Sequence, residues 1–286
     1  MKRLLLISTL ILVSSTFFYC CNTGGSGKAY VIKMRLNKGD TFSQDMQMHM
    51  VMNTAGMKMN MQSNTANSFQ VMNNTANEKE LKMTYQKIDM SMDMGPGRTI
   101  NSDSLRQRAS QNIVGKSVIM KLSNDNEITA VEGFEDIINS QTDSAAKMVT
   151  KKMFSKDQLN NMFSIMFSMY PKKPVRVGDN WTSKSTIKMM NMDMTVENKY
   201  TLVSVKNGLA EINIDGTIGS NGELMKGSAS GMKMDLSGTQ KGTITIRMDN
   251  GYLHSGSYKM DMKSEMEMMG RKMEMVMNAD YTVKGI

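Results

Sequence analysis

Residues 46–61 read MQMHMVMNTAGMKMNM, so methionine occupies every second position on both sides of a short polar turn. Successive side chains of a β-strand point to opposite faces, and this period of two therefore places the thioethers on one face of a hairpin. Gln47 and His49 then lie on the other face. With Thr54 and Ala55 at the tip, the expected cross-strand pairs are Met52 with Met57, Met50 with Met59 and Met48 with Met61.

The C-terminal stretch repeats the pattern. A two-residue turn at Gly270-Arg271 would pair Met268 with Met273 and Met266 with Met275, while the alternate positions are mostly charged. One face is therefore expected to meet water and the other to be apolar. The expected apolar groove consists of Met48, Met50, Met52, Met57, Met59, Met61, Met266, Met268, Met273 and Met275.

Alternation with a period of two dominates the chain from residue 29 onward and predicts a mainly β fold. Turn residues (Gly, Asn and Asp) separate the alternating stretches. The predicted strands are 29–36, 41–52, 57–71, 79–93, 117–123, 127–131, 181–190, 193–206, 209–217, 231–236, 239–249, 251–264 and 271–285.

Helical spacing appears mainly between residues 133 and 170. A short helix is also predicted from Ser102 to about Asn112. From Ser155 onward apolar residues recur three and four positions apart, and Pro171 ends the pattern because proline cannot continue a helix. We expect a large curled antiparallel sheet, an open or half barrel, with a helical insertion at about 133–170 covering one face.

The N-terminus is typical of a lipoprotein signal peptide. Lys2 and Arg3 precede an apolar run that is too short to span a bilayer, and the run leads to Cys20-Cys21. We predict a signal peptide over 1–20 and lipidation of Cys21, which follows a small residue. An ordinary secretory signal is the alternative interpretation.

The expected domain organisation follows from this leader. Residues 21–28, rich in Gly and Ser, form a flexible tether, and residues 29–286 form the β-rich domain. Gly-Asp turns at Gly39-Asp40 and Gly178-Asp179 each precede a strand, which suggests a repeat of two halves, 29–132 and 174–286. We expect both aspartates to bond their own backbone.

The composition restricts the classes of function. Methionine occurs 36 times, aromatic residues make up 6%, and the formal net charge is +8. The basic residues are interspersed with acidic ones, which indicates a solvated mixed surface. Nucleic-acid binding would need clustered Lys and Arg with stacking aromatic residues, so no nucleic-acid partner is expected.

Catalytic and cofactor motifs were not found. The sequence has no G-x-S-x-G, H-E-x-x-H or P-loop motif, and its two cysteines lie at the leader junction. We therefore expect no enzyme, no catalytic residue, no cofactor and no metal site of ordinary ligand type.

Three interpretations of the methionine stripe stay open. Methionine could simply fill a core in place of Leu, Val or Ile. It could line a pliable groove for an acyl chain or another apolar ligand, because its unbranched side chain adapts to irregular shapes. Its thioethers could also bind Cu(I), although His49 is expected to point away from them.

The leader cysteine, the strand pair from Gly115-Lys116-Ser117 to Val131-Glu132-Gly133 and the segment PVRVGDNW at 174–181 resemble a family of uncharacterised lipoproteins typical of Bacteroidota. The likeness covers most of the mature chain. It implies an envelope location and a fold, since the family carries no established activity. By analogy of shape alone, the expected sheet is similar to the half-barrel of LolA/LppX-type periplasmic carriers.

These observations predict an envelope lipoprotein anchored to a membrane by its N-terminal lipid. Acidic residues directly after Cys21 are absent, which favours an anchor that faces the periplasm. The expected ligand is apolar, or a partner lipoprotein occupies the groove instead. The alternatives are a structural or protein-interaction lipoprotein without a small ligand, and Cu(I) binding by the methionine clusters.

Overall fold

The computed structural model describes residues 27–54, 57–75, 78–93, 113–124, 126–139, 147, 167–189, 192–223, 233–268 and 271–286. The leader, Cys21 and most of the tether lie outside these residues, as do the expected helix at 102–112 and most of the expected helix after Ser155. No helix among the described residues is long and apolar enough to cross a membrane.

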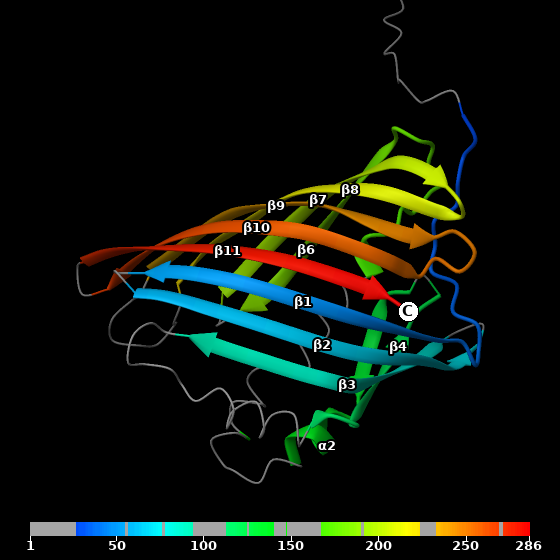
Figure 1. Cartoon of the computed structure of the whole chain (residues 1–286), viewed down its shortest axis with the longest axis horizontal. Helices are drawn as coiled ribbons and strands as arrows, with labels where there is room; N and C mark the ends of the chain where they lie inside the picture. The colour runs from blue at the N-terminus through cyan, green and yellow to red at the C-terminus, as the bar shows by residue number, and fades with distance from the viewer. Residues whose placement is uncertain are drawn as a thin grey trace, which may run out of the picture.

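A single antiparallel sheet of eleven strands dominates the described chain, in the order β5-β4-β3-β2-β1-β11-β10-β9-β8-β7-β6 (Figure 1). Neighbouring strands of the sheet are consecutive in the sequence except at the centre, where the first strand pairs with the last. The strands are β1 (Thr41–Thr54), β2 (Met57–Asn74), β3 (Lys79–Asp93), β4 (Ser117–Leu122), β5 (Ile128–Glu132), β6 (Asn180–Met189), β7 (Met192–Lys206), β8 (Leu209–Glu223), β9 (Lys233–Arg247), β10 (Leu253–Met268) and β11 (Arg271–Gly285).

The sequence predicted these strands closely, with two differences. Residues 231–236 and 239–249 were expected as two strands but belong to one, β9, which runs through Gly238. The predicted strand at 29–36 is wrong. That segment forms only an isolated bridge between Tyr30 and Val175, although its side chains do alternate between buried and exposed.

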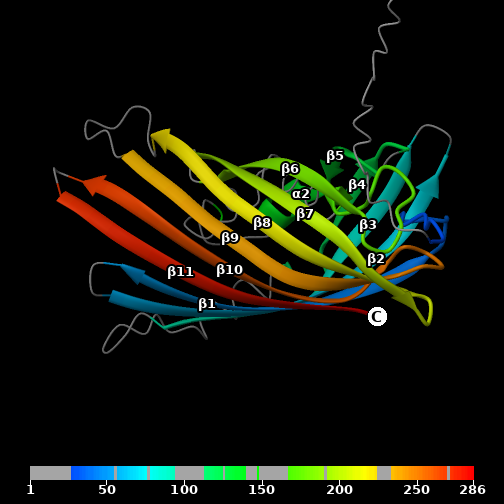
Figure 2. The same ribbon diagram turned by 90° about the horizontal axis from the view of Figure 1, so that it is seen from above.

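The expected curl into an open or half barrel is also wrong. The sheet is open and twisted (Figure 2), and its edge strands β5 and β6 do not pair. Closing a sheet requires the two edges to meet in a staggered register. Here the chain that connects the edges packs into the cores on one side of the sheet, through Ile137, Phe167, Met169 and Val175, and this packing keeps the edges apart.

The expected helical insertion is present only in small part among the described residues. The one helix whose bounds are described is α2 (Phe134–Asn139), with Ile137 and Ile138 buried. It has acidic residues in its first turn, where the helix dipole favours negative charge.

Residues 30–36, which we call the strap, run across the ends of the strands (Figure 1, dark blue). The backbone groups of the strap bond to turns instead of to a neighbouring strand: the Arg35 N–H donates to the Asn250 carbonyl oxygen at 2.8 Å, and the Met34 carbonyl oxygen accepts from the side chain of Asn126 at 3.1 Å. This explains why an alternating segment is not a strand here. Ile32, Met34 and Leu36 are almost fully buried.

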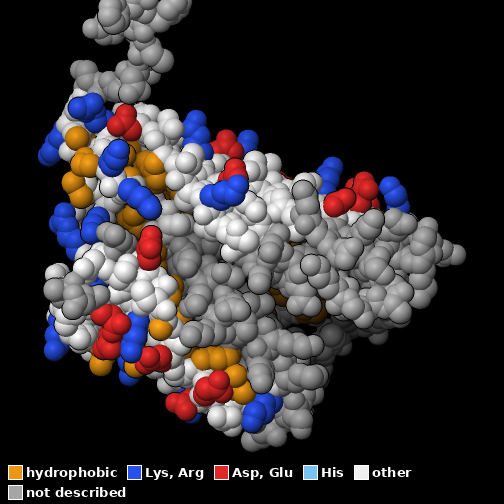
Figure 3. Space-filling model, turned by 180° about the vertical axis from the view of Figure 1, so that it is seen from behind, with side chains coloured by type: hydrophobic (Ala, Val, Ile, Leu, Met, Phe, Trp, Pro, Cys, Tyr) orange, Lys and Arg blue, Asp and Glu red, His pale blue; other side chains and the backbone are white. Residues whose placement is uncertain are grey.

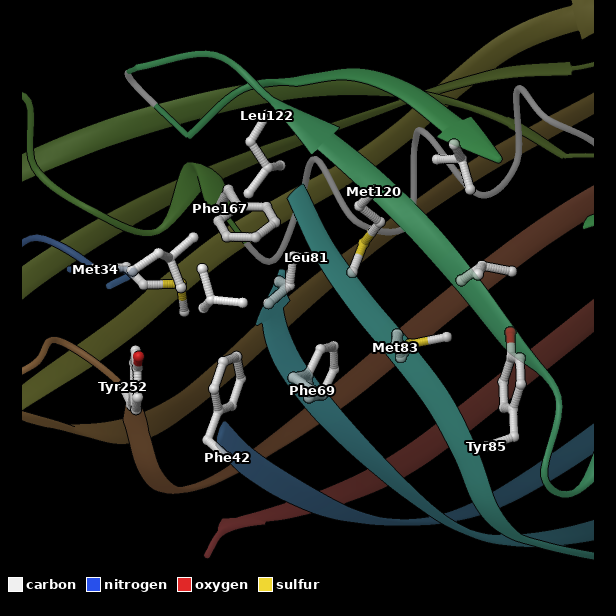
Figure 4. Packing of buried hydrophobic residues seen from close by; sticks show 14 of the residues in the cluster. Met34, Phe42, Phe69, Leu81, Met83, Tyr85, Met120, Leu122, Phe167 and Tyr252 are labelled. Atoms are coloured by element: carbon white, nitrogen blue, oxygen red, sulfur yellow. The ribbon is translucent and has the colours of Figure 1, made fainter. Parts of the chain in front are cut away.

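The strap joins two apolar cores on one face of the sheet, which we call the inner face. The first core lies over β1–β4, where Phe42 and Phe69 stack 4.7 Å apart and Met34 of the strap lies close by (Figure 4). The second core lies over β7–β10 and includes Ile32, Leu202 and Ile246. Together the cores fill the inner face at the strap end of the strands.

The two Gly-Asp turns have the same hydrogen bonds. One carboxylate oxygen of Asp40 accepts from the backbone N–H of Asn37 at 2.9 Å, and Asp179 does the same for Arg176 at 2.8 Å. Both glycines have φ near +92°, a backbone conformation that favours glycine. The proposed repeat of halves 29–132 and 174–286 stays a prediction.

Candidate apolar binding face

The strand methionines gather on the inner face beyond the two cores. Because residues directly paired across antiparallel strands share a face, the register assigns each one: Met48, Met50 and Met52 share the face of Phe42. We call the following set the methionine face: Met46, Met48, Met50 and Met52 of β1, Met57, Met59 and Met61 of β2, Met90 and Met92 of β3, Met194 of β7, Met260 and Met262 of β10, and Met273, Met275 and Met277 of β11.

The predicted cross-strand partners are wrong by two residues. Met50 pairs with Met61, and Met52 pairs with Met59. The last pair of the hairpin is therefore Thr54 with Met57.

The same difference occurs at the second predicted hairpin. Met266 pairs with Met273, and Met268 pairs with Arg271. A shift of two residues leaves every side chain on its predicted face, whereas a shift of one would have reversed them all. The expected gathering of thioethers on one side of the sheet is therefore confirmed for the paired strands.

Exposure separates most of this face from the two cores, while Met194 and Met262 belong to a third buried cluster with Val196, Ile218 and Leu236. Met34, Met83 and Met120 in the first core are at most 1% exposed. On the methionine face Met57 is 51% exposed and Met46 is 38% exposed. The remaining members whose side chains are described are half-buried, apart from Met194 and Met262, which are buried: Met48, Met50, Met52, Met59, Met61, Met90, Met92, Met260, Met273, Met275 and Met277. The side chains of Met266 and Met268 lie outside the described set.

An aromatic row separates the second core from the methionine face. Trp181 and Tyr200 stack at 5.6 Å, and Tyr258 and Tyr281 stack at 4.7 Å, all in register across the sheet. Gly242 lies opposite Tyr258, and a side chain there would overlap the Ser257 carbonyl oxygen and the Cβ atom of Tyr258. Burial raises the pKa of Tyr258, so the hydroxyl stays neutral at physiological pH.

A few polar groups are buried on the inner face. Ser220 and Ser264 lie on either side of Leu236, and their hydroxyl oxygens are buried without a hydrogen-bond partner. Nearby, the amide of Asn198 accepts a hydrogen bond from Gln240 and donates to Tyr200 at 3.2 Å. Each of these serine hydroxyls therefore has an unused hydrogen-bond donor on this face.

The opposite, outer face of the sheet is polar. It carries ion pairs at its surface, including Lys259 with Asp280 at 3.3 Å and Lys184 with Glu197. His49 lies on this face, paired with Asp280 and Gln62, as the alternation predicted. A hollow of about 750 Å³ also lies there, lined by alternating polar residues of β7–β11.

Hydrophobic side chains reach the surface on the side of the molecule shown in Figure 3, beside Lys, Arg, Asp and Glu. Within the part of the chain that the structure describes, no three His, Cys, Asp or Glu side chains gather as a metal site of those ligands would need.

Sequence reasoning missed several members of this face. Met260, Met262 and Met277 continue the same period of two on β10 and β11, so the alternation that identified Met273 and Met275 was sufficient to find them. The buried hydroxyls of Ser220 and Ser264 left no such signal, because a serine in an alternating stretch is expected on a wet face as often as on a buried one.

The fold and this face define a class of protein: a mainly β chain with one large open antiparallel sheet and a thioether-lined face. The chain belongs to a family of unknown function, DUF6263, whose family model matches residues 76–253. This agrees with the expected resemblance to an uncharacterised family.

Two solved structures align with most of this chain at low identity. A lipovitellin structure described as "Lipid-protein interactions in lipovitellin" aligns with 88% of this chain at 10% identity and a TM-score of 0.49. This chain spans 25% of the length of that structure. The COG4313 outer membrane channel from Pseudomonas putida F1 aligns with 88% of this chain and 97% of its own at 8% identity, with a TM-score of 0.24. No curated protein matches the chain.

Proposed function

We propose that this protein binds an apolar ligand, such as the acyl chain of a lipid, on its methionine face. The observation that supports the proposal is the different character of the two faces of the sheet. Half-exposed thioethers gather on one face, and charged residues occupy the other. Methionine is unbranched and polarisable, so a surface made of it can adapt to a flexible chain. Apolar area that the ligand covers contributes about 25 cal/mol per Å².

The dimensions suit an extended acyl chain. The run from Met46 to Met52 covers about 20 Å along β1, at about 3.3 Å per residue. Neighbouring strands carry thioethers beside this run for much of its length. The unpartnered hydroxyls of Ser220 and Ser264 add hydrogen-bond donors on the same face, and apolar ligand sites typically contain a few such polar groups.

The test is binding of a fluorescent palmitate analogue to the purified protein and to the variant Met50→Gln/Met61→Gln. These two residues face each other across β1 and β2 in the middle of the face. Glutamine has a similar length but a polar end, whose desolvation opposes ligand binding. We expect the variant to bind at least about tenfold more weakly, which corresponds to about 1.4 kcal/mol.

The matched control is His49→Gln/Val51→Gln, which places the same new side chains on the outer face of β1. The control is expected to bind as the wild type does. Equal affinity for all three proteins would contradict the proposal, as would native mass spectra that show a purified protein free of lipid and unable to take up the analogue. That result would favour the alternative of a structural or protein-interaction lipoprotein.

The proposed location is the cell envelope, with Cys21 lipidated and the anchor facing the periplasm. The support is the leader pattern, in which a short apolar run ends at a cysteine that is followed by a Gly/Ser tether. We expect mass spectrometry of the mature N-terminus to show Cys21 carrying acyl chains, and Cys21→Ser to leave the protein out of the membrane fraction. An unmodified N-terminus would rule this anchor out.

A further inference from the structure

Four neighbouring strands bring thioethers into one continuous row. Met59 of β2 pairs with Met52 of β1, Met52 pairs with Met277 of β11, and Met277 pairs with Met262 of β10. We call these four residues the thioether row. Directly paired residues have their Cβ atoms about 4.5–5.5 Å apart. Two rotatable bonds position the sulfur of each methionine and a third turns its methyl group, so sulfurs on neighbouring strands can approach one ion.

The neighbouring rows of the methionine face are interrupted. Ala279 stands between Met50 and Met260 in the row nearer the cores. Thr54 stands between Met57 and Met275 in the row nearer the strand ends. Among the described strands, the thioether row is where methionines on four adjacent strands are paired without interruption, whereas Met50, Met61 and Met92 form a row of three.

The surroundings of the row are neutral. Its neighbours on the same face are Met50, Met61, Ala279, Thr54 and Met275, none of which carries a charge. A hard divalent cation would find no carboxylate there to offset its loss of hydration. A soft monovalent cation meets the donors it prefers, because thioethers select Cu(I) over hard ions.

The row also offers a buried end and an accessible end. Met262 is 6% exposed, and Gly238 opposite it has no side chain, which leaves space for the Met262 side chain. Met52, Met59 and Met277 are half-buried, so an ion can reach them from solvent.

We propose that Met52, Met59 and Met277, beside the buried Met262, form a thioether site for Cu(I). The site goes beyond acyl-chain binding, because it depends on the sulfur atoms and not on apolar area. That difference allows the two proposals to be tested separately on the same face.

Replacing methionine with leucine separates sulfur from apolar volume, since the two side chains exchange in packed surroundings at low cost. The test variant is Met52→Leu/Met277→Leu, which removes the two central donors of the row. The matched control is Met46→Leu/Met57→Leu. Its residues lie on the same face but are opposed by Val283, Thr65 and Thr54 instead of by methionine.

The experiment is an anaerobic Cu(I) titration against a chromogenic chelator, followed by NMR of proteins labelled with ¹³C at the methionine methyl groups. The wild type and the control should hold one Cu(I) and shift the methyl signals of the row. The test variant should lose at least about 100-fold in affinity, as loss of ligands predicts. The palmitate analogue is titrated against the same three proteins, so that a loss of Cu(I) binding is measured separately from a loss of apolar binding.

Two results would overturn the Cu(I) site. One is a wild type that neither competes for Cu(I) nor shows shifted methyl signals. The other is a test variant that retains the affinity of the control. Failure of palmitate binding with Cu(I) binding intact would instead contradict the acyl-chain proposal and leave the metal site standing.

Discussion

Replacing Gly251 with alanine is expected to lower the free energy of unfolding by about 3–5 kcal/mol. Gly251 has φ of +77°, where a side chain is strained by about 1–2 kcal/mol. A Cβ atom there would also overlap the carbonyl oxygen of Lys33 and lie 2.7 Å from the Cα of Met34. These are backbone atoms of the strap, so the strap itself would have to move.

Displacing the strap is costly because its side chains belong to both cores. Ile32 packs in the core over β7–β10, and Met34 packs in the core over β1–β4. The Gly251 carbonyl oxygen also accepts a hydrogen bond from the Tyr170 hydroxyl at 2.8 Å. A shift at Gly251 therefore loosens contacts in both cores of the inner face at once.

Gly208→Ala is the matched control. Gly208 has φ of +75°, almost the same as Gly251, but a Cβ atom there would meet nothing within 4 Å. The control should show the backbone strain alone, about 1–2 kcal/mol. Urea unfolding followed by circular dichroism measures both variants. Equal decreases in the free energy of unfolding for the two variants would show that the strap moves without cost and adds nothing to stability.

Strand positions were predictable because the alternation is local. Each strand of this sheet has one apolar and one polar face, so a period of two in the sequence predicts a strand directly. The strap shows the limit of that signal. Residues 30–36 alternate as a strand does, but whether an extended segment finds a partner strand depends on the rest of the chain.

The break predicted inside β9 failed for a related reason. The sequence predicts separate strands at 231–236 and 239–249, whereas Gly238 lies within one strand and leaves space for Met262 on the neighbouring strand. Whether a strand needs a glycine at one position depends on the residue that pairs with it on the neighbouring strand. That residue is not known until the strand pairing is known.

The openness of the sheet could not be predicted from local pattern. It depends on the connection between the edge strands β5 and β6, which packs Ile137, Phe167 and Val175 into the inner-face cores. Nor does alternation say which strands pair. The central contact joins β1 to β11 over a sequence separation of more than two hundred residues. The thioether row exists only because of that pairing.

Raising the pH above 10 is expected to destabilise the fold steeply. Burial raises the pKa of Tyr85 to about 12, and it raises the pKa of Tyr170, Tyr252, Tyr258 and Tyr281 as well. In each case the phenol is neutral in the folded state at a pH where the unfolded chain already ionises. Tyr252 is also held neutral by donating to the carboxylate of Asp40 at 2.9 Å.

The sign follows from linkage. Below pH 10, the ordinary pKa of tyrosine, both states are protonated and these groups add no pH dependence. Between that value and the raised pKa only the unfolded chain loses the proton, so each tyrosine removes up to about 1.4 kcal/mol per pH unit. Tyr85 alone accounts for about 3 kcal/mol by the pH of its folded pKa, and the other four add to the loss.

Urea unfolding at a series of pH values, together with the ultraviolet absorbance of tyrosinate, measures this loss. We expect the unfolding midpoint to fall from about pH 10 upward and the tyrosinate signal to appear in step with unfolding. Tyr85→Phe removes one of the five ionising groups, so the decline of the unfolding midpoint with pH should be shallower by the contribution of one tyrosine.

A midpoint that stays constant as the pH rises past 11 would show that these phenols ionise without unfolding the protein. It would also show that the aromatic row beside the methionine face is open to water, which would count against an apolar ligand site there.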